Sequence, residues 1–158
     1  MVFTQNNFKD PQLPGGGETL GESHIILTSK DFEDGLQVGR FAQYVSGASP
    51  SLKNMDGTAS PVIVGVVKRY LGREVEEGET INTDLHTHVQ YVRWGLCTVD
   101  VRDGESPERF GSVYVSNNGD ADDGLATATD TDVGINATFL HEAGDGAWVI
   151  MLGMNGGL

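Results

Sequence analysis

The sequence predicts an all-β fold, a small β-barrel or sandwich of about eight short strands that follows an extended N-terminal arm. Short apolar runs alternate with turn residues from position 24 onward. The composition, with 22 Gly, 38% hydrophobic and 21% charged residues, is typical of a loop-rich globular chain. No long window carries a helical stripe. Residues 30–43, the best helical segment, are interrupted by Gly35 and Gly39, so we expect one or two helical turns there at most.

The first 22 residues differ from the rest and are expected to form an arm. Residues 23–158 are expected to form a single β domain, which the length of 158 residues suits. Prolines and a run of three glycines exclude regular structure from the arm, yet it also carries large apolar side chains. Burying a Phe contributes about 1.5–3 kcal/mol, so these side chains indicate an arm that orders on another surface. A frayed terminus that carries these Phe residues without a contact is the alternative interpretation. The expected contact residues are Phe3, Phe8, Pro11, Leu13 and Pro14.

The first half of the β domain is expected to contain three strands, at residues 24–27, 36–45 and 61–70. The third includes residues 62–67, which are apolar on both faces and rich in β-branched side chains. We therefore expect this strand to be buried on both sides, at the centre of the core. Residues 46–60 contain Gly, Pro and Asn but no periodic apolar set, which predicts a long surface loop.

The second half is expected to contain strands at residues 89–94, 96–102, 112–116, 136–141 and 147–152. The 96–102 segment alternates strictly, which places Cys97, Val99 and Val101 on the core side and leaves the other face mostly exposed to water. Gly95 is expected to form a bulge or kink before it. The last strand is apolar at every position from Trp148 on, which predicts a central or covered strand.

The charge pattern argues against two classes of partner. Ten Lys and Arg against 23 Asp and Glu give a net charge of −13, whereas nucleic acids and anionic membranes require a basic face. No segment approaches the ~20 apolar residues of a membrane span, and no secretory signal is present, so we expect a soluble protein made in a cytoplasm. No Lys or Arg follows Arg109. This acidic last third indicates a solvated surface, a docking face for a basic partner, a cation site or a head-to-tail contact between copies.

The strongest local motif for metal chemistry is the pair His86 and His88. In a strand, two His residues at this spacing lie on one face and can share a metal ion. With Gly78 and Gly95 the segment is similar to the first motif of the cupins, which are small β-barrels. However, no Glu follows His88 before Gly95, and no Pro-x-Gly turn precedes His141. A cupin-like metal-binding barrel is the alternative interpretation, and two surface imidazoles are the simpler one.

Other candidate sites are weaker. Residues 120–124 offer hard oxygen ligands for calcium but lack the EF-hand spacing, so we expect a solvated turn. Cys97, the single cysteine, is expected to lie among valines as a small hydrophobe. The sequence contains no Gly-x-Ser-x-Gly nucleophile motif and no phosphate-binding loop. We therefore expect no catalytic residue, no metal site and no cofactor, and we expect that the protein is not an enzyme.

From residue 36 onward the order of Gly and Val positions resembles the structural cement, or capsid decoration, proteins of tailed bacteriophages. The resemblance covers most of the chain and combines a Gly-Val-Val segment, two strands joined through a Gly, a short Gly-initiated strand, a loop containing Gly and Thr, and an Asn-Ala-Thr-Phe segment that leads to the last apolar strand. These features lie at residues 64–69, 89–101, 111–115, 124–129 and 136–139.

The resemblance implies a noncatalytic role. Copies of a cement protein bind the exterior of the capsid in the virion, bridge neighbouring subunits of the major capsid protein and strengthen the head. It also implies a homo-oligomer, with a trimer favoured and a dimer as the alternative. The arm residues would then contact the capsid or a neighbouring subunit. A tail or adhesion module of the same virion is the remaining interpretation.

Overall fold

A computed structural model describes residues 25–45, 51–68, 80–144 and 146–153 of the chain. These residues form strands and connecting turns, and they include no helix, hence none that could cross a membrane. The strands are β1 (Ile25–Ser29), β2 (Leu36–Gln37), β3 (Phe41–Tyr44), β4 (Leu52–Asn54), β5 (Ile63–Val67), β6 (Thr80–Ile81), β7 (Val89–Asp100), β8 (Ser112–Val115), β9 (Ala126–Thr127), β10 (Val133–Gly144) and β11 (Ala147–Leu152).

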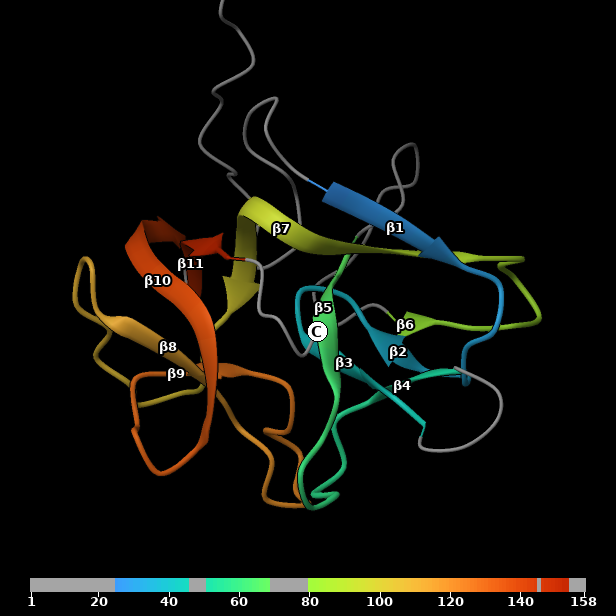
Figure 1. Ribbon diagram of the computed structural model, residues 1–158, viewed down its shortest axis with the longest axis horizontal. Coiled ribbons are helices and arrows are strands. Elements are labelled where there is room, and N and C mark those ends of the chain that lie inside the picture. Colours follow the sequence, from blue (N-terminus) through green and yellow to red (C-terminus); the bar gives the residue numbers. More distant parts are fainter. Residues whose placement is uncertain (1–24, 46–50, 69–79, 145, 154–158) are drawn as a thin grey trace, which may run out of the picture.

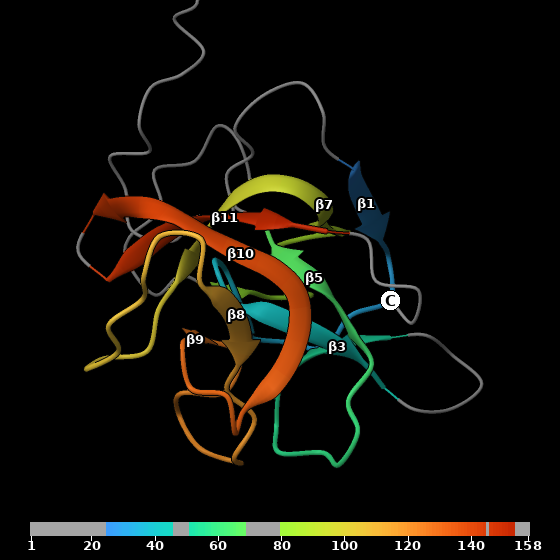
Figure 2. The same ribbon diagram turned by 60° about the vertical axis from the view of Figure 1, so that its left-hand side comes forward.

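One large antiparallel sheet dominates the molecule and curls into a half-barrel (Figure 1). Its strand order is β4-β3-β5-β7-β11-β10-β8-β9, with β1 also paired to β7, while β2 and β6 form a separate small ribbon. Figure 2 shows how strongly β10 bends as it passes β8, and its register shifts three times along its two neighbours. The predicted all-β class is confirmed, with more strands than expected and two that are 12 residues long.

Strand β7 joins the two halves of the sheet. Its first half, up to Trp94, pairs with β1 and β5, and its second half, from Gly95 to Asp100, pairs with β11. The sequence predicts two strands here, but the structure has one continuous strand through Gly95, whose φ is +110°. The expected bulge lies slightly earlier: Ile25 pairs with Trp94 and Ile26 with Val92, so Arg93 is the extra residue.

Strand β5 separates two hydrophobic clusters, because its side chains are buried on both faces. Ile63 and Val66 face one cluster, and Val64 and Val67 face the other. Residues three apart share a face here because β5 carries a bulge: the neighbouring strand β3 skips Val64 in the register. The predicted position of this strand, buried on both sides at the centre of the core, is confirmed.

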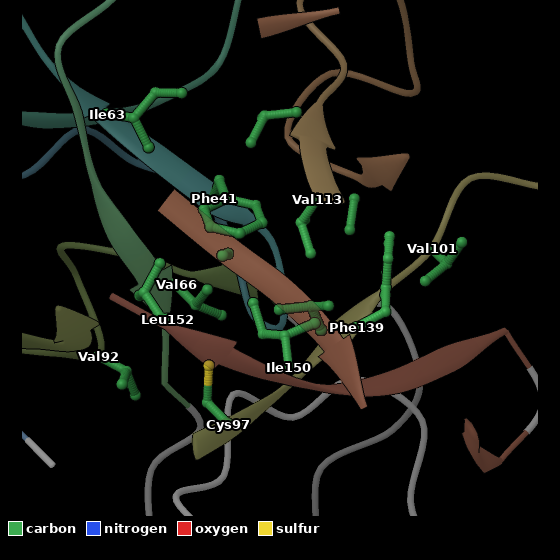
Figure 3. Packing of buried hydrophobic residues seen from close by; sticks show 14 of the residues in the cluster. Phe41, Ile63, Val66, Val92, Cys97, Val101, Val113, Phe139, Ile150 and Leu152 are labelled. Atoms are coloured by element: carbon green, nitrogen blue, oxygen red, sulfur yellow. The ribbon is translucent and has the colours of Figure 1, made fainter. Parts of the chain in front are cut away.

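The larger cluster fills the half-barrel between the two halves of the sheet (Figure 3). The buried ring of Phe139 packs edge-to-face with the partly buried ring of Trp148, with 5.5 Å between ring centroids and 76° between ring planes. The other side chains are mainly β-branched, as a pleated sheet favours. The buried members are Phe41, Met55, Ile63, Val66, Val92, Cys97, Val99, Val101, Val113, Val115, Ala126, Ala137, Phe139, Ile150 and Leu152.

The closest backbone approach in the core lies between β5 and β7. Gly65 has a φ of +150°, and a Cβ at this position would stand 2.1 Å from the carbonyl oxygen of Val92. No side chain fits in that distance, so only glycine lets the two strands meet here. The bulges of β5 and β7 therefore lie against each other. As a result, each of the two strands contributes side chains to both hydrophobic clusters.

One expectation for the first half is wrong. The segment predicted as a long surface loop, residues 46–60, contains β4, with Leu52 fully buried and Met55 only 4% exposed. The backbone of Leu52 is bound by residues distant in the sequence: its amide donates to the carbonyl oxygen of Asp31, and its carbonyl oxygen accepts from the amide of Glu33. Residues 30–43, for which the sequence allows one or two helical turns at most, contain no helix. The strand predicted at residues 36–45 is present as β2 and β3, separated by a turn, and its apolar residues pack across the sheet.

One expectation for β7 also needs correction. Cys97, Val99 and Val101 face the core as predicted, but the opposite face is not mostly exposed to water, because Thr98 is 0% exposed. Thr98 lies opposite Val149 of β11, which is itself 1% exposed. The prediction that the last strand is central is confirmed, since β11 lies between β7 and β10.

The contact at Gly65 gives a direct test of the fold. Gly65→Ala places a methyl group on the Val92 carbonyl, so we expect the free energy of unfolding to fall by at least about 3 kcal/mol, or folding to fail. Urea denaturation followed by circular dichroism measures this loss. Gly104→Ala is the matched control, because Gly104 has a φ of +80° but open space around its Cβ position, and it should cost only about 1–2 kcal/mol. Equal losses in the two variants would contradict this account.

Candidate assembly interface

The most unusual surface residue is Phe110, at the end of the turn that leads into β8. Its side chain is 68% exposed, and its backbone has a φ of +67°. The left-handed region is rare for a bulky aromatic residue and costs of order 1–3 kcal/mol. The surrounding structure must therefore hold this residue in place.

Backbone hydrogen bonds hold the turn to the core. The amide of Phe110 donates to the carbonyl oxygen of Phe139 at 2.7 Å, and the amide of Phe139 donates to the carbonyl oxygen of Gly111 at 2.9 Å. Gly111 also donates to the carbonyl oxygen of Glu108 at 2.9 Å. Since the Phe139 side chain is fully buried, the turn presents the Phe110 ring on a rigid base.

Arg109 completes this feature. Its guanidinium carbon lies 4.9 Å from the centre of the Phe110 ring, within the range of a cation–π contact. Both side chains are exposed. We call residues 109 and 110 the Arg109–Phe110 tip. Arg and aromatic residues are enriched in the energetically dominant positions of protein interfaces, so the composition of the tip is typical of a docking element.

A second surface lies at the other end of β8, where the loops 55–62 and 116–124 meet at the lower end of the view in Figure 1. We call these two loops the acidic end. Asn117 joins them, because its Oδ1 accepts from the amide of Gly57 at 2.8 Å and its Nδ2 donates to the carbonyl oxygen of Thr58 at 2.9 Å. The Arg40 guanidinium donates to the carbonyl oxygens of Ala121 and Asp123, at 2.6 and 3.2 Å.

The carboxylates of the acidic end divide into two groups. Asp123 is only 6% exposed and accepts from the amides of Asn118 and Gly119, at 2.6 and 2.9 Å. It therefore shapes the loop, and residues 120–124 form a turn organised around this carboxylate. Asp120 and Asp122 are exposed. Val62, the last residue of loop 55–62 before β5, has an apolar side chain that is 48% exposed.

Asp56 of the acidic end takes part in a local network. Lys53 donates to its carboxylate at 2.6 Å, and the Thr58 hydroxyl and the Gln43 amide group donate to its other oxygen at 2.6 and 2.7 Å. The hydrogen bonds from Lys53 and Thr58 hold the pKa of Asp56 well below its ordinary value. Asp56 therefore stays charged across the neutral range and helps to fix loop 55–62.

Another polar network ties the turn after β7 to the turn after β9. Arg102 forms ion pairs with Glu105 and with Asp132, the latter at 3.2 Å. Glu105 also accepts from the amide of Ala128 at 2.9 Å and from the hydroxyl of Thr129 at 3.0 Å. Burial alone would raise the pKa of Glu105, but these donors, led by Arg102, outweigh it and lower the pKa. The network acts as a structural clamp.

His86 and His88, the pair that suggests a metal site, do not lie in a strand. His86 ends a turn that starts at Asn82, with its amide 2.9 Å from the Asn82 carbonyl oxygen, and His88 immediately precedes β7. His141 lies opposite Val149 of β11, which in turn lies opposite Thr98 near the far end of β7. In the described ranges, no group of three or more His, Cys, Asp or Glu side chains comes together as metal ligands would.

Cys97 is placed as the sequence predicts. Its side chain is 0% exposed in the larger cluster, and burial raises the pKa of its thiol to about 12. A thiol in this environment is a core side chain, not a nucleophile.

The contact residues that the sequence predicts and the tip that the structure presents lie in different parts of the chain. The predicted arm contacts, Phe3, Phe8, Pro11, Leu13 and Pro14, lie outside the described residues. The Arg109–Phe110 tip was not predicted. The available signal was a large aromatic residue inside a turn-rich stretch, residues 103–111, where polar residues are the rule.

The Glu105 clamp predicts a pH-dependent loss of stability. Because folding lowers the pKa of Glu105, its contribution is complete above the ordinary pKa and is lost as the pH falls through the lower, folded-state value. Glu105→Gln should therefore cost about 1–2 kcal/mol at pH 7 and progressively less below pH ~4. Chemical denaturation at several pH values measures this. Glu108→Gln, an exposed carboxylate on the same turn, is the control and should stay within about 0.5 kcal/mol of wild type.

Comparison with known proteins identifies one informative relationship. No protein-family model matches the chain, and no curated protein does. Among solved structures, the chain is similar to a chain of "The capsid of Myoviridae Phage XM1", with a TM-score of 0.78 and 26% sequence identity over 89% of this chain and 90% of that chain. The two chains thus share their fold over nearly their whole lengths. The resemblance in the order of Gly and Val positions is thereby confirmed at the level of a phage capsid-related protein family.

Proposed function

We propose that the protein is a structural cement protein that binds the outer surface of a tailed-phage capsid and bridges neighbouring subunits of the major capsid protein. The observation that carries the proposal is the shared fold with a chain of a phage capsid, over 89% of this chain. That similarity supports a structural role in a capsid. The more specific role as external cement is supported by the order of Gly and Val positions and by the physical features below.

The charge of the chain supports a position on the outside. A net charge of −13 is unfavourable for contact with packaged DNA, because a protein on the inner face of a head would meet a dense array of phosphates. The same charge keeps unbound copies soluble until they meet the shell. A nonenzymatic role is supported by how the polar groups are used: Glu105 and Asp123 both hold backbone amides of neighbouring turns.

The arm, residues 1–22, is the part we assign to capsid contact, through Phe3, Phe8, Pro11, Leu13 and Pro14. Its point of attachment supports this. Strand β1 starts at Ile25, directly after the arm, and pairs with β7 from Trp94 to Val89. Because β7 is the strand shared by both halves of the sheet, a load on the arm passes directly into the core. The β domain, residues 23–158, would remain on the shell surface.

We further propose that the protein acts as a homo-oligomer, with a trimer favoured and a dimer as the alternative. Copies joined to one another bind the repeating lattice at several points at once, so the total attachment can greatly exceed that of a single weak contact. Such an oligomer would bridge capsid subunits without needing a tight site on any one of them.

Binding to heads assembled without this protein tests the proposed function. Purified protein is added to such heads, and cryo-electron microscopy is used to count and locate the bound copies. We expect saturable density at fixed lattice positions on the outer surface and a higher temperature for head disruption. Protein spread without lattice order, or found only inside the shell or on the tail, would contradict the proposal.

Deleting residues 1–17 tests the arm separately. We expect the truncated chain to keep its melting temperature within a few degrees but to bind heads at least about tenfold more weakly, because the apolar contacts of the arm are gone. A full-length variant with Phe3, Phe8 and Leu13 changed to Ser separates the loss of these side chains from the loss of chain length. Unchanged affinity in both variants would exclude the arm as a contact element.

A further inference from the structure

We propose that copies of this chain associate head to tail, with the Arg109–Phe110 tip of one copy seated against the acidic end of the next. The inference rests on the proposed function, since it names the contact through which a cement protein would form its oligomer. The occupant of the tip's docking surface is thus a second copy of the same chain. Four observations support this assignment.

The first observation is the presentation of Phe110. Its ring is 68% exposed although its backbone is held in the left-handed region by hydrogen bonds to Phe139 of the core. The left-handed backbone and the exposure of a large apolar ring to water each cost free energy. Backbone strain of this kind concentrates at functional sites. Burial of the ring against a partner recovers part of this cost.

The second observation is that the environment of Arg109 differs from those of Arg40, Lys53 and Arg102. Arg40 donates to two carbonyl oxygens of its own chain, Lys53 pairs with Asp56, and Arg102 pairs with Glu105 and Asp132. Arg109, by contrast, is exposed and lies over the Phe110 ring. It is also the last cation in the sequence. A partner that accepts the tip must therefore supply carboxylates beside an apolar area.

The third observation is that the acidic end has this chemistry. Asp120 and Asp122 are exposed on loop 116–124, and Val62 is 48% exposed on the adjoining loop. The two loops are joined through Asn117, so they form one surface. Exposed carboxylates and an exposed aliphatic side chain on two joined loops complement a guanidinium stacked on an aromatic ring.

The fourth observation is the placement of the two surfaces. The tip immediately precedes β8, and loop 116–124 immediately follows it, so they lie at opposite ends of one strand that is paired to β9 and β10. In Figure 1 the turn before β8 lies at the left edge and the acidic end at the bottom. The rigid sheet keeps the two apart within one copy, so each must find its complement on another. A contact between two different surfaces of identical chains forms a ring where the rotation from one copy to the next closes.

Charge reversal tests the pairing in solution, without capsids. Sedimentation velocity over about a hundredfold range of concentration is expected to show reversible association of the wild type. Arg109→Glu and Asp122→Arg should each weaken association at least about tenfold, because like charges then face each other. In the double variant R109E/D122R, each contact again joins opposite charges, with their positions exchanged. This variant should recover association to within a few fold of wild type.

The aromatic contribution is tested with Phe110→Gly. Glycine accepts a φ of +67° without strain, so the melting temperature should stay within a few degrees of wild type while association weakens at least about tenfold. Leu85→Ser is the matched control, because Leu85 is 62% exposed on the turn before β7, away from both surfaces. This variant should associate as wild type does.

The outcomes separate this proposal from the proposed function. A monomeric wild type, full association in F110G and R109E, or no recovery in R109E/D122R would each overturn the head-to-tail contact. The cement function is judged only by binding to heads, so ordered binding by a monomeric protein would preserve that function and remove this inference. Conversely, an oligomer that follows the charge-reversal pattern but ignores heads would preserve the contact and remove the cement function.

Discussion

The fold depends on the place where the paired strands β5 and β7 approach each other without a side chain between them. Gly65 brings the two backbones so close that the Val92 carbonyl occupies the space of a Cβ. Each strand carries a bulge at this point, which changes the face that its following residues present. One sheet can therefore line two hydrophobic clusters, with Val66 and Val92 on one side and Val67 and Tyr91 on the other.

Strands could be predicted from the sequence where the residues next to one another carried the pattern, and not where contacts distant in the sequence determine the structure. The buried strand around Val64 and the inward position of Cys97 were predictable, because uniform apolarity and strict alternation are read directly from neighbouring residues. The strand at Leu52 was missed because it has no local apolar pattern: it is held by pairing with β3 and by backbone hydrogen bonds to Asp31 and Glu33, about twenty residues earlier. The burial of Thr98 was missed for the same reason, because it depends on packing across the sheet rather than on local sequence.

The candidate site was harder to predict than the fold. The tip requires knowing that Phe110 adopts a left-handed conformation, which no propensity scale assigns to an aromatic residue. Its position is fixed by Phe139, almost thirty residues later in the chain. The pair His86 and His88, in contrast, has a conspicuous His-x-His spacing but does not lie in a strand. His86 therefore lies in a turn and not on one face of a sheet. The most conspicuous sequence motif and the candidate site are therefore different parts of this chain.

The burial of Cys97 has a practical consequence. The chain contains one cysteine, and burial both shields its thiol and disfavours the thiolate that reacts with maleimides and similar reagents. The native protein therefore behaves toward such reagents like a cysteine-free scaffold. A cysteine introduced at an exposed turn position such as Ser106 would be the reactive one, so dyes, epitopes or crosslinkers could be attached at a single chosen point without altering the interior.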